Sequence, residues 1–141
     1  MQKVVVKKSE FLHGAPMEAR PGVKDIKVIY PETGMAAKTL CVGIVEIDAG
    51  AHSPRHRHNC EETYYVLSGK GYIQTDEGRH EFEDGDAILN RENVFHSVYN
   101  TGSEKVRLLV VGGIMFVPLW PKWPTESPYE IDQGDVDRGN S

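Results

Sequence analysis

Between residues 38 and 115 the chain is a series of short apolar or alternating segments, separated by glycine, asparagine and aspartate. Strand-length runs with this spacing are typical of an all-β sandwich or barrel, and no long helical pattern interrupts them. The separating residues tolerate the positive φ angles of tight turns, so we interpret the glycines as turn formers and not as phosphate binders. The segments predicted to be strands are 28–30, 39–47, 56–58, 63–67, 71–75, 80–83, 87–89, 96–100 and 106–111.

The length of 141 residues is ordinary for one domain with its own hydrophobic core. We predict a single domain over residues 1–141, with a barrel core at about 38–116 and irregular arms at 1–37 and 117–141. The second arm carries Trp120 and Trp123 among several prolines, and we expect it to pack against its own domain or a partner subunit. Residues 132–141 are polar and are expected to fray.

The charge balance is mildly acidic, with 16 lysine and arginine residues, 21 aspartate and glutamate residues, and a net charge of -5. No basic stripe is present, so nucleic acid is not an expected partner. Residues 1–11 are too short and too polar for a signal peptide or a membrane span, and we therefore expect a cytoplasmic protein without a membrane partner. Cys41 and Cys60 are predicted to be buried free thiols, because two cysteines do not make a disulfide framework.

The strongest functional signal is the pair His56 and His58, followed four residues later by Glu62. Alternate side chains of a β-strand point to the same face, and residues two apart are separated by about 6.6 Å. If one uninterrupted strand runs through this segment, His56, His58 and Glu62 converge on one point and Glu61 faces solvent. A bulge after His58 would remove this argument.

Imidazole and carboxylate groups together suit iron, manganese, nickel, copper or zinc, and the lack of cysteine argues against a closed structural zinc site. His96, far downstream, completes a set of four candidate ligands. Four ligands on an octahedral ion leave two positions open, and chemistry at a metal requires such exchangeable positions. The pattern therefore favours a reactive metal centre over a purely structural one.

The segment from Gly50 to Gly69 resembles the first signature of the cupin superfamily at every spacing. That signature is glycine, five residues, His-x-His, three residues, glutamate, six residues and glycine, and it matches here through His56, His58 and Glu62.

Gly85, His96 and Asn100 fall at the intervals of the second cupin signature. The turn inside that signature departs from the usual pattern, because Arg91 replaces a proline and Asn93 replaces a glycine. Asparagine also adopts the left-handed conformation that such a turn needs. The departure thus concerns the turn and not the candidate ligands.

The resemblance implies a small double-stranded β-helix barrel, which is a jelly-roll relative. It also implies that one divalent transition metal ion lies inside the barrel and is bound by His56, His58, Glu62 and His96. The fourth ligand would connect distant strands through the ion and couple metal binding to stability. Small cupins commonly pair their barrels, which predicts a homodimer.

The function implied by the resemblance is a metal-dependent enzyme that acts on a small organic molecule. An iron(II) dioxygenase is the favoured class, with Fe2+ preferred over Mn2+, Ni2+, Zn2+ and Cu2+. Glu62 is then both a ligand and a candidate proton shuttle. A non-oxidative isomerase, lyase or decarboxylase is the first alternative, and a binding or sensing module without turnover is the second.

Tyr64 continues the inward series from Glu62, so its ring is expected to line the cavity with its hydroxyl available as an acid or base. A core aromatic with a satisfied hydroxyl is the competing interpretation. Arg57 is expected to face outward, and Arg55 is placed at the loop entry. The apolar residues predicted for the cavity wall or the core are Val66, Val94, Phe95, Val98 and Met115.

Overall fold

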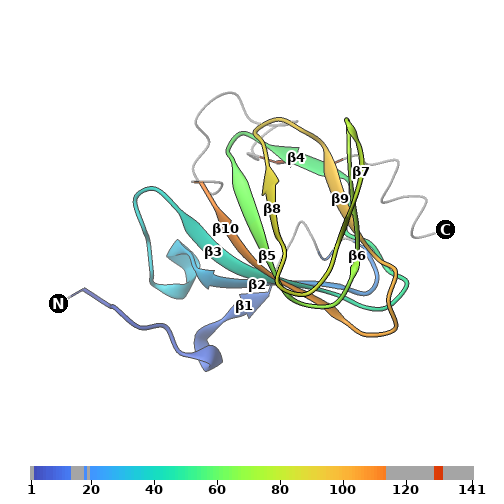
Figure 1. The fold of residues 1–141 in the computed structure, drawn as a ribbon. Coiled ribbons are helices and arrows are strands. Elements are labelled where there is room, and N and C mark those ends of the chain that lie inside the picture. Colours follow the sequence, from blue (N-terminus) through green and yellow to red (C-terminus); the bar gives the residue numbers. More distant parts are fainter. Residues whose placement is uncertain (1, 14–17, 19, 114–128, 132–141) are drawn as a thin grey trace.

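Two antiparallel β-sheets face each other and form a barrel (Figure 1) in the computed structural model, which describes residues 2–13, 18, 20–113 and 129–131. The six-stranded sheet has the order β1 (Leu12–His13), β2 (Val23–Ile29), β3 (Cys41–Ile47), β10 (Val106–Gly112), β5 (Glu62–Ser68) and β8 (Ala87–Asn90). The five-stranded sheet has the order β11 (Tyr129–Ile131), β4 (His56–His58), β9 (His96–Asn100), β6 (Gly71–Thr75) and β7 (Gly78–Phe82). Short 3-10 helices cover Lys8–Glu10 and Pro31–Thr33. The predicted all-β jelly-roll architecture is therefore confirmed.

The apolar core lies between the two sheets. Strands β3 and β5 alternate between buried residues on their inner faces and more exposed residues on their outer faces, as the period of a strand requires. Burial of a large aliphatic side chain stabilises a fold by about 1.5–3 kcal/mol, so a row of such residues dominates its stability. The best-buried core residues are Ile47, Val66, Val98, Val106 and Leu108.

The first long strand begins earlier than predicted. The sequence pattern indicated a strand at 28–30, whereas β2 covers Val23–Ile29 and pairs with β3 along its length. The register places Val23 opposite Ile47, Asp25 opposite Val45 and Lys27 opposite Gly43. The sheet thus extends into the segment expected to be an irregular arm. The sequence did not show the alternation of a strand here, because Asp25 and Lys27 on the inward-facing side of β2 are charged.

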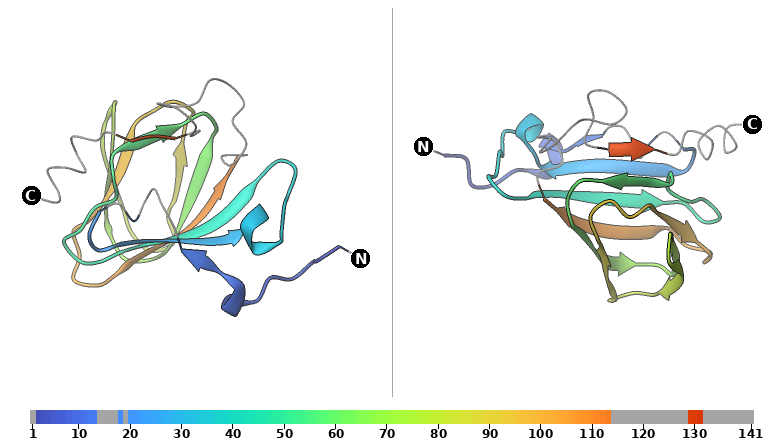
Figure 2. Two further views of the ribbon diagram at one scale, coloured as in Figure 1. Left: turned by 180° about the vertical axis from the view of Figure 1, so that it is seen from behind. Right: turned by 90° about the horizontal axis from the view of Figure 1, so that it is seen from above.

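The second expected arm also contributes to the barrel. Tyr129–Ile131 pairs antiparallel with His56–His58 at the edge of the five-stranded sheet, and the two strands run side by side in Figure 2. The predicted packing of Trp120 and Trp123 and the cavity position of Met115 lie outside the described residues. Within the described residues, no helix has the length and apolarity needed to cross a bilayer.

The turn before β9 has the backbone conformation predicted for it. Asn93 has a φ of 63°, and it is the one non-glycine residue with a positive φ in the described part of the chain. Its backbone N–H donates a hydrogen bond to the carbonyl oxygen of His58 at 2.9 Å. The unusual turn therefore fixes the end of β4, which carries two of the candidate ligands.

Candidate metal centre

The four candidate ligands come from three strands in two sheets. His56 and His58 project inward from β4, and His96 on the neighbouring strand β9 is the register partner of His56. Glu62 begins β5 in the opposite sheet. The expectation of one uninterrupted strand through His58 and Glu62 was wrong, because the chain bends at residues 59–60 and crosses between the sheets. Glu62 nevertheless faces the histidines from across the barrel.

The donor atoms of His56, His58, Glu62 and His96 all lie within 4.8 Å of one another. The three histidines are each 1% exposed, and Glu62 is 5% exposed. Glu62 Oε1 is 3.3 Å from His58 Nε2 and 3.4 Å from His96 Nε2. These four side chains therefore form a compact polar cluster inside the barrel.

Each histidine is held in one tautomer by a backbone carbonyl. The Nδ1 atoms of His56, His58 and His96 lie 2.9 Å from the carbonyl oxygens of Pro54, Cys60 and Val94, respectively. A carbonyl oxygen can only accept, so each Nδ1 donates and carries the proton. The Nε2 atom of a neutral histidine then presents a lone pair to the cluster. Hydrogen bonding of the distal nitrogen in this way is typical of metal-ligating histidines.

This donor set fits a divalent transition metal ion. Imidazole nitrogens and a carboxylate oxygen suit iron, manganese, nickel, copper and zinc. Buried lone pairs and a buried carboxylate without a cation carry a large desolvation cost, which an ion at their centre offsets. The Sγ of Cys60 approaches His58 from its Nδ1 side, at 3.8 Å, and so lies away from the nitrogen that faces the cluster.

The comparisons with known proteins agree with this arrangement. The cupin domain family matches residues 43–112, a range that contains all four candidate ligands. The chain belongs to the cupin superfamily. Among curated proteins, the uncharacterized protein MJ1618 of Methanocaldococcus jannaschii is 27% identical over 104 residues, which cover 72% of this chain and 82% of that protein.

Solved cupin structures have the same fold. The polyketide cyclase RemF from Streptomyces resistomycificus superimposes with a TM-score of 0.65 and 23% identity, covering 80% of each chain. A predicted oxalate decarboxylase from Thermotoga maritima superimposes with a TM-score of 0.64 and 24% identity, covering 78% of this chain and 98% of that one. At these identities the likeness establishes the fold of this cupin.

The charges of the cluster are strongly coupled in the absence of an ion. Burial alone would raise the pKa of Glu62, but the adjacent His58 and His96 rings lower it well below its usual range. Burial lowers the pKa of His58, yet the Glu62 carboxylate outweighs it and raises that pKa to about 10. Burial, followed by repulsion from His96 and His58, lowers the pKa of His56 well below its usual range. His58 and Glu62 thus form a buried ion pair that an incoming metal ion must replace.

Asn90 is a residue of the site that the sequence pattern did not single out. It lies opposite Glu62 in the register of β5 and β8, and its Nδ2 donates a hydrogen bond to Glu62 Oε1 at 3.3 Å. The side chain is 4% exposed. This contact orients the carboxylate toward the histidines. The sequence signal that could have indicated Asn90 is its position as a polar residue at the end of a predicted strand.

Tyr64 lies inside the barrel, as its parity predicted. Its side chain is 4% exposed, and its ring lies 6.1 Å from the His96 ring in an edge-on arrangement. Burial, and then the nearby Glu62 carboxylate, raise the pKa of Tyr64 well above its usual value. The hydroxyl therefore keeps its proton at neutral pH, so it can serve as a donor but not as a base.

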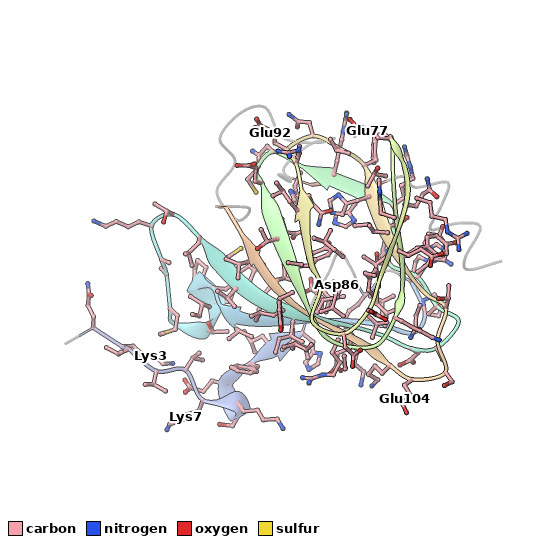
Figure 3. The ribbon with its side chains drawn as sticks, viewed as in Figure 1. Lys3, Lys7, Glu77, Asp86, Glu92 and Glu104 are labelled. Carbon is pink, nitrogen blue, oxygen red and sulfur yellow. The ribbon has the colours of Figure 1, made fainter. Side chains whose placement is uncertain are left out.

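One cavity is lined by members of the cluster, and a second is linked to it through Asn90. A small enclosed one, of about 20 Å³, is bounded by His56, Glu62 and Tyr64 together with residues of β2 and β3. A wider one, of about 420 Å³, opens between the edges of the two sheets and is lined in part by Asn90 and Val94. The wider pocket extends to Glu77, which lies with Glu92 at one end of the barrel, away from Glu104 (Figure 3). Asn90 connects this pocket to Glu62.

The remaining predicted residues lie around the centre and not in it. Glu61 is exposed and Cys60 is a buried free thiol, as expected. Arg55 forms an ion pair with Asp76 at 2.8 Å. Phe95, a predicted wall or core residue, instead contacts two guanidinium groups, those of Arg55 at 4.0 Å and Arg57 at 4.7 Å from its ring centroid. Phe95 therefore makes cation–π contacts and is not part of the hydrophobic core cluster.

Proposed function

We propose that this cupin is a metal-dependent enzyme that acts on a small oxygen-bearing organic molecule. The observation that carries the proposal is the tautomer of the three histidines, whose Nδ1 atoms are each held by a backbone carbonyl. This arrangement prepares three Nε2 lone pairs to converge with the Glu62 carboxylate. In this account His56, His58, Glu62 and His96 hold one divalent transition metal ion, with Fe2+ favoured and Mn2+, Ni2+, Zn2+ and Cu2+ as alternatives.

When bound, such an ion supplies a Lewis acid and, if it is iron, one-electron chemistry with dioxygen. The protein supplies orientation and proton control. Asn90 fixes the Glu62 carboxylate, and the high pKa of Tyr64 keeps its hydroxyl protonated and able to donate to a developing negative charge. We therefore propose Tyr64 as a hydrogen-bond donor to the substrate and Glu62 as a ligand that also exchanges a proton with the substrate.

The substrate enters, in this account, through the pocket between the sheet edges. Its volume of about 420 Å³ suits a small molecule, and Asn90 in its wall contacts Glu62 directly. The lining combines apolar residues, among them Ile73 and Phe82, with charged ones at the rim, including Glu77 and Arg91. Such a pocket favours a molecule with an apolar portion and polar oxygen atoms.

Iron-dependent dioxygenation is the first candidate reaction, because three imidazoles and one carboxylate leave two exchangeable positions on an octahedral ion. A non-oxidative isomerase, lyase or decarboxylase is the second candidate. It is supported by the protonated hydroxyl of Tyr64, which can donate a hydrogen bond, and by the similar structures of a polyketide cyclase and a predicted oxalate decarboxylase.

Oxygen consumption separates the two classes. Protein reconstituted with Fe2+ and, separately, with Mn2+ is supplied with a panel of small hydroxy acids, keto acids and diketones, with and without dioxygen. Dioxygenation predicts oxygen uptake with the iron form only. Non-oxidative chemistry predicts substrate loss without oxygen, whereas substrate binding without any loss in both forms would contradict the proposal and favour a sensing module.

A further inference from the structure

The small enclosed cavity connects the candidate metal centre with an acidic residue of the first long strand. His56, Glu62 and Tyr64 form one side of this cavity, and Asp25 and Tyr30 form another. Its volume of about 20 Å³ is enough for one water molecule, since a single probe-sized sphere needs about 10–15 Å³. The polar groups around it supply the hydrogen-bonding partners that a buried water requires.

Asp25 faces the barrel interior because of its register. It lies opposite Val45 on β3, between the inward-facing positions Val23 and Lys27. Its backbone N–H donates to Glu18 Oε2 at 2.8 Å. Among the described residues, no donor forms a hydrogen bond or ion pair with the Asp25 carboxyl group. A half-buried carboxyl group without a donor is costly, and this cost suggests a use beyond structure.

The charged and titratable groups that face Asp25 come from several elements. Lys27 lies two residues along β2, Glu18 lies in the segment before that strand, and Glu62 begins β5 of the same six-stranded sheet. Burial, and then the negative charge of Glu62, raise the pKa of Asp25 to about 7, while Lys27 opposes this shift. His56, Tyr30 and Tyr64 complete the surroundings. At neutral pH such a carboxyl group both takes up and releases protons.

We propose that Asp25 is a proton-relay residue for substrate bound at the centre, and that one water molecule in the enclosed cavity carries the proton to it. An O–H or C–H bond of the substrate breaks, and the electron pair stays on the substrate. The water accepts that proton and passes one of its own to Asp25 Oδ, so charge and atoms balance. This inference rests on the proposed function.

Tyr64 and the three histidines do not take this role. Tyr64 keeps its proton, because its pKa lies well above the usual value. The three histidines donate through Nδ1 to backbone carbonyls and direct Nε2 toward the cluster. Asp25 is also outside residues 43–112, the range that matches the cupin domain family, so β2 supplies a function that this range does not contain.

Proton release on Zn2+ binding tests the relay without any substrate. Titration calorimetry at about pH 7, in two buffers with different ionisation enthalpies, gives the number of protons released per ion. The wild type is compared with Asp25→Asn, with Asp25→Glu, which retains the acid, and with Glu92→Gln, an exposed control. Circular dichroism verifies that each variant is folded.

The relay predicts that Asp25→Asn releases about half a proton less than the wild type, because a carboxyl group near its pKa is half protonated. Asp25→Glu should restore the release, Glu92→Gln should match the wild type, and the difference should vanish at about pH 9, where Asp25 is already ionised. Equal release by folded wild type and Asp25→Asn would overturn the relay alone. No Zn2+ binding by any variant would instead refute the metal centre, and with it this inference.

Discussion

His56 and His96 face each other as a register pair on β4 and β9, with their ring centroids 4.3 Å apart and each side chain almost fully buried. Two adjacent buried histidines repel each other if both are charged, so at least one of the two must be neutral. Their Nε2 atoms belong to the cluster and are suited to a metal ion. The pairing therefore links the stability of the barrel to occupancy of the centre.

Asn90→Ala should weaken metal binding by about 10- to 100-fold, as is typical when a hydrogen-bonding partner of a metal ligand is removed. The substitution removes the Nδ2 contact that orients Glu62 but leaves all four candidate ligands. Competition with a chelator of known affinity measures the change. Glu77→Gln, in the rim of the same pocket, is the control and should bind metal normally. Unchanged affinity in Asn90→Ala would show that Glu62 is oriented without Asn90.

The stabilisation of the protein by metal should increase with pH. In the metal-free protein the pKa of His58 is raised to about 10, so its contribution to stability is complete below about pH 6.5 and is lost as the pH rises through 10. The pKa of Glu62 is lowered, so its contribution is present above about pH 4.5 and is lost as the pH falls through the folded-state value. The ion must displace the proton of His58, and this becomes easier at high pH.

Thermal unfolding with and without Zn2+ at about pH 6 and pH 9 measures this effect. We expect the shift in Tm caused by the ion to be larger at the higher pH. A shift that is larger at the lower pH would contradict the ion-pair description of His58 and Glu62.

Asp25→Asn should make the metal-free protein more stable at pH 8, by about 1–2 kcal/mol. The pKa of Asp25 rises from 3.8 to about 7 on folding, so the folded state holds more protons in that range and loses stability as the pH increases from about 4 to 7. The amide avoids the burial of a charge. Chemical denaturation at about pH 4 and pH 8 gives the comparison. An equal effect of the substitution on the free energy of unfolding at both pH values would show that the Asp25 carboxyl group has the same pKa in the folded and unfolded protein.

The outer face of the six-stranded sheet is expected to form a homodimer contact. Tyr65, Leu67 and Leu89 are 47%, 40% and 46% exposed, and they lie on adjacent strands of that face. An apolar patch of this kind is typical of an interface. Light scattering should give the mass of a dimer for the wild type and of a monomer for Leu67→Glu, with Glu92→Gln unchanged. A wild-type monomer from micromolar to millimolar concentration would refute the dimer.

The regular part of the barrel was predictable because its strands alternate cleanly. The bounds predicted for 56–58, 71–75 and 96–100 are the observed ones. β2 was largely missed because Asp25 and Lys27 occupy inward-facing positions, which local periodicity interprets as loop. One of these two residues, Asp25, is the relay residue proposed above. Local periodicity thus failed at Asp25, whose burial has an energetic cost that core packing does not explain.

The position of Glu62 was predicted correctly through an incorrect local structure. Strand parity assumed a continuous segment from His58 to Glu62, whereas the chain changes sheets between them. Only the spacing shared with cupins indicated the actual arrangement. Contacts such as that of Asn90 with Glu62 depend on pairing between strands 28 residues apart, which no local pattern encodes. Phe95 was misplaced because the two arginines that contact its ring are about 40 residues away in the sequence, so no local pattern indicates these contacts.

Elemental analysis of protein purified without added metal, beside His58→Ala, His96→Ala and the exposed-histidine control His80→Ala, shows whether the four clustered side chains bind a metal ion. The account predicts about one transition metal ion per chain in the wild type and in His80→Ala, and loss of that ion in the two variants of the cluster, because each removes a Nε2 donor. Absence of metal from the wild type, even after reconstitution with Fe2+, Mn2+ and Zn2+, or equal metal content in all four proteins, would contradict it.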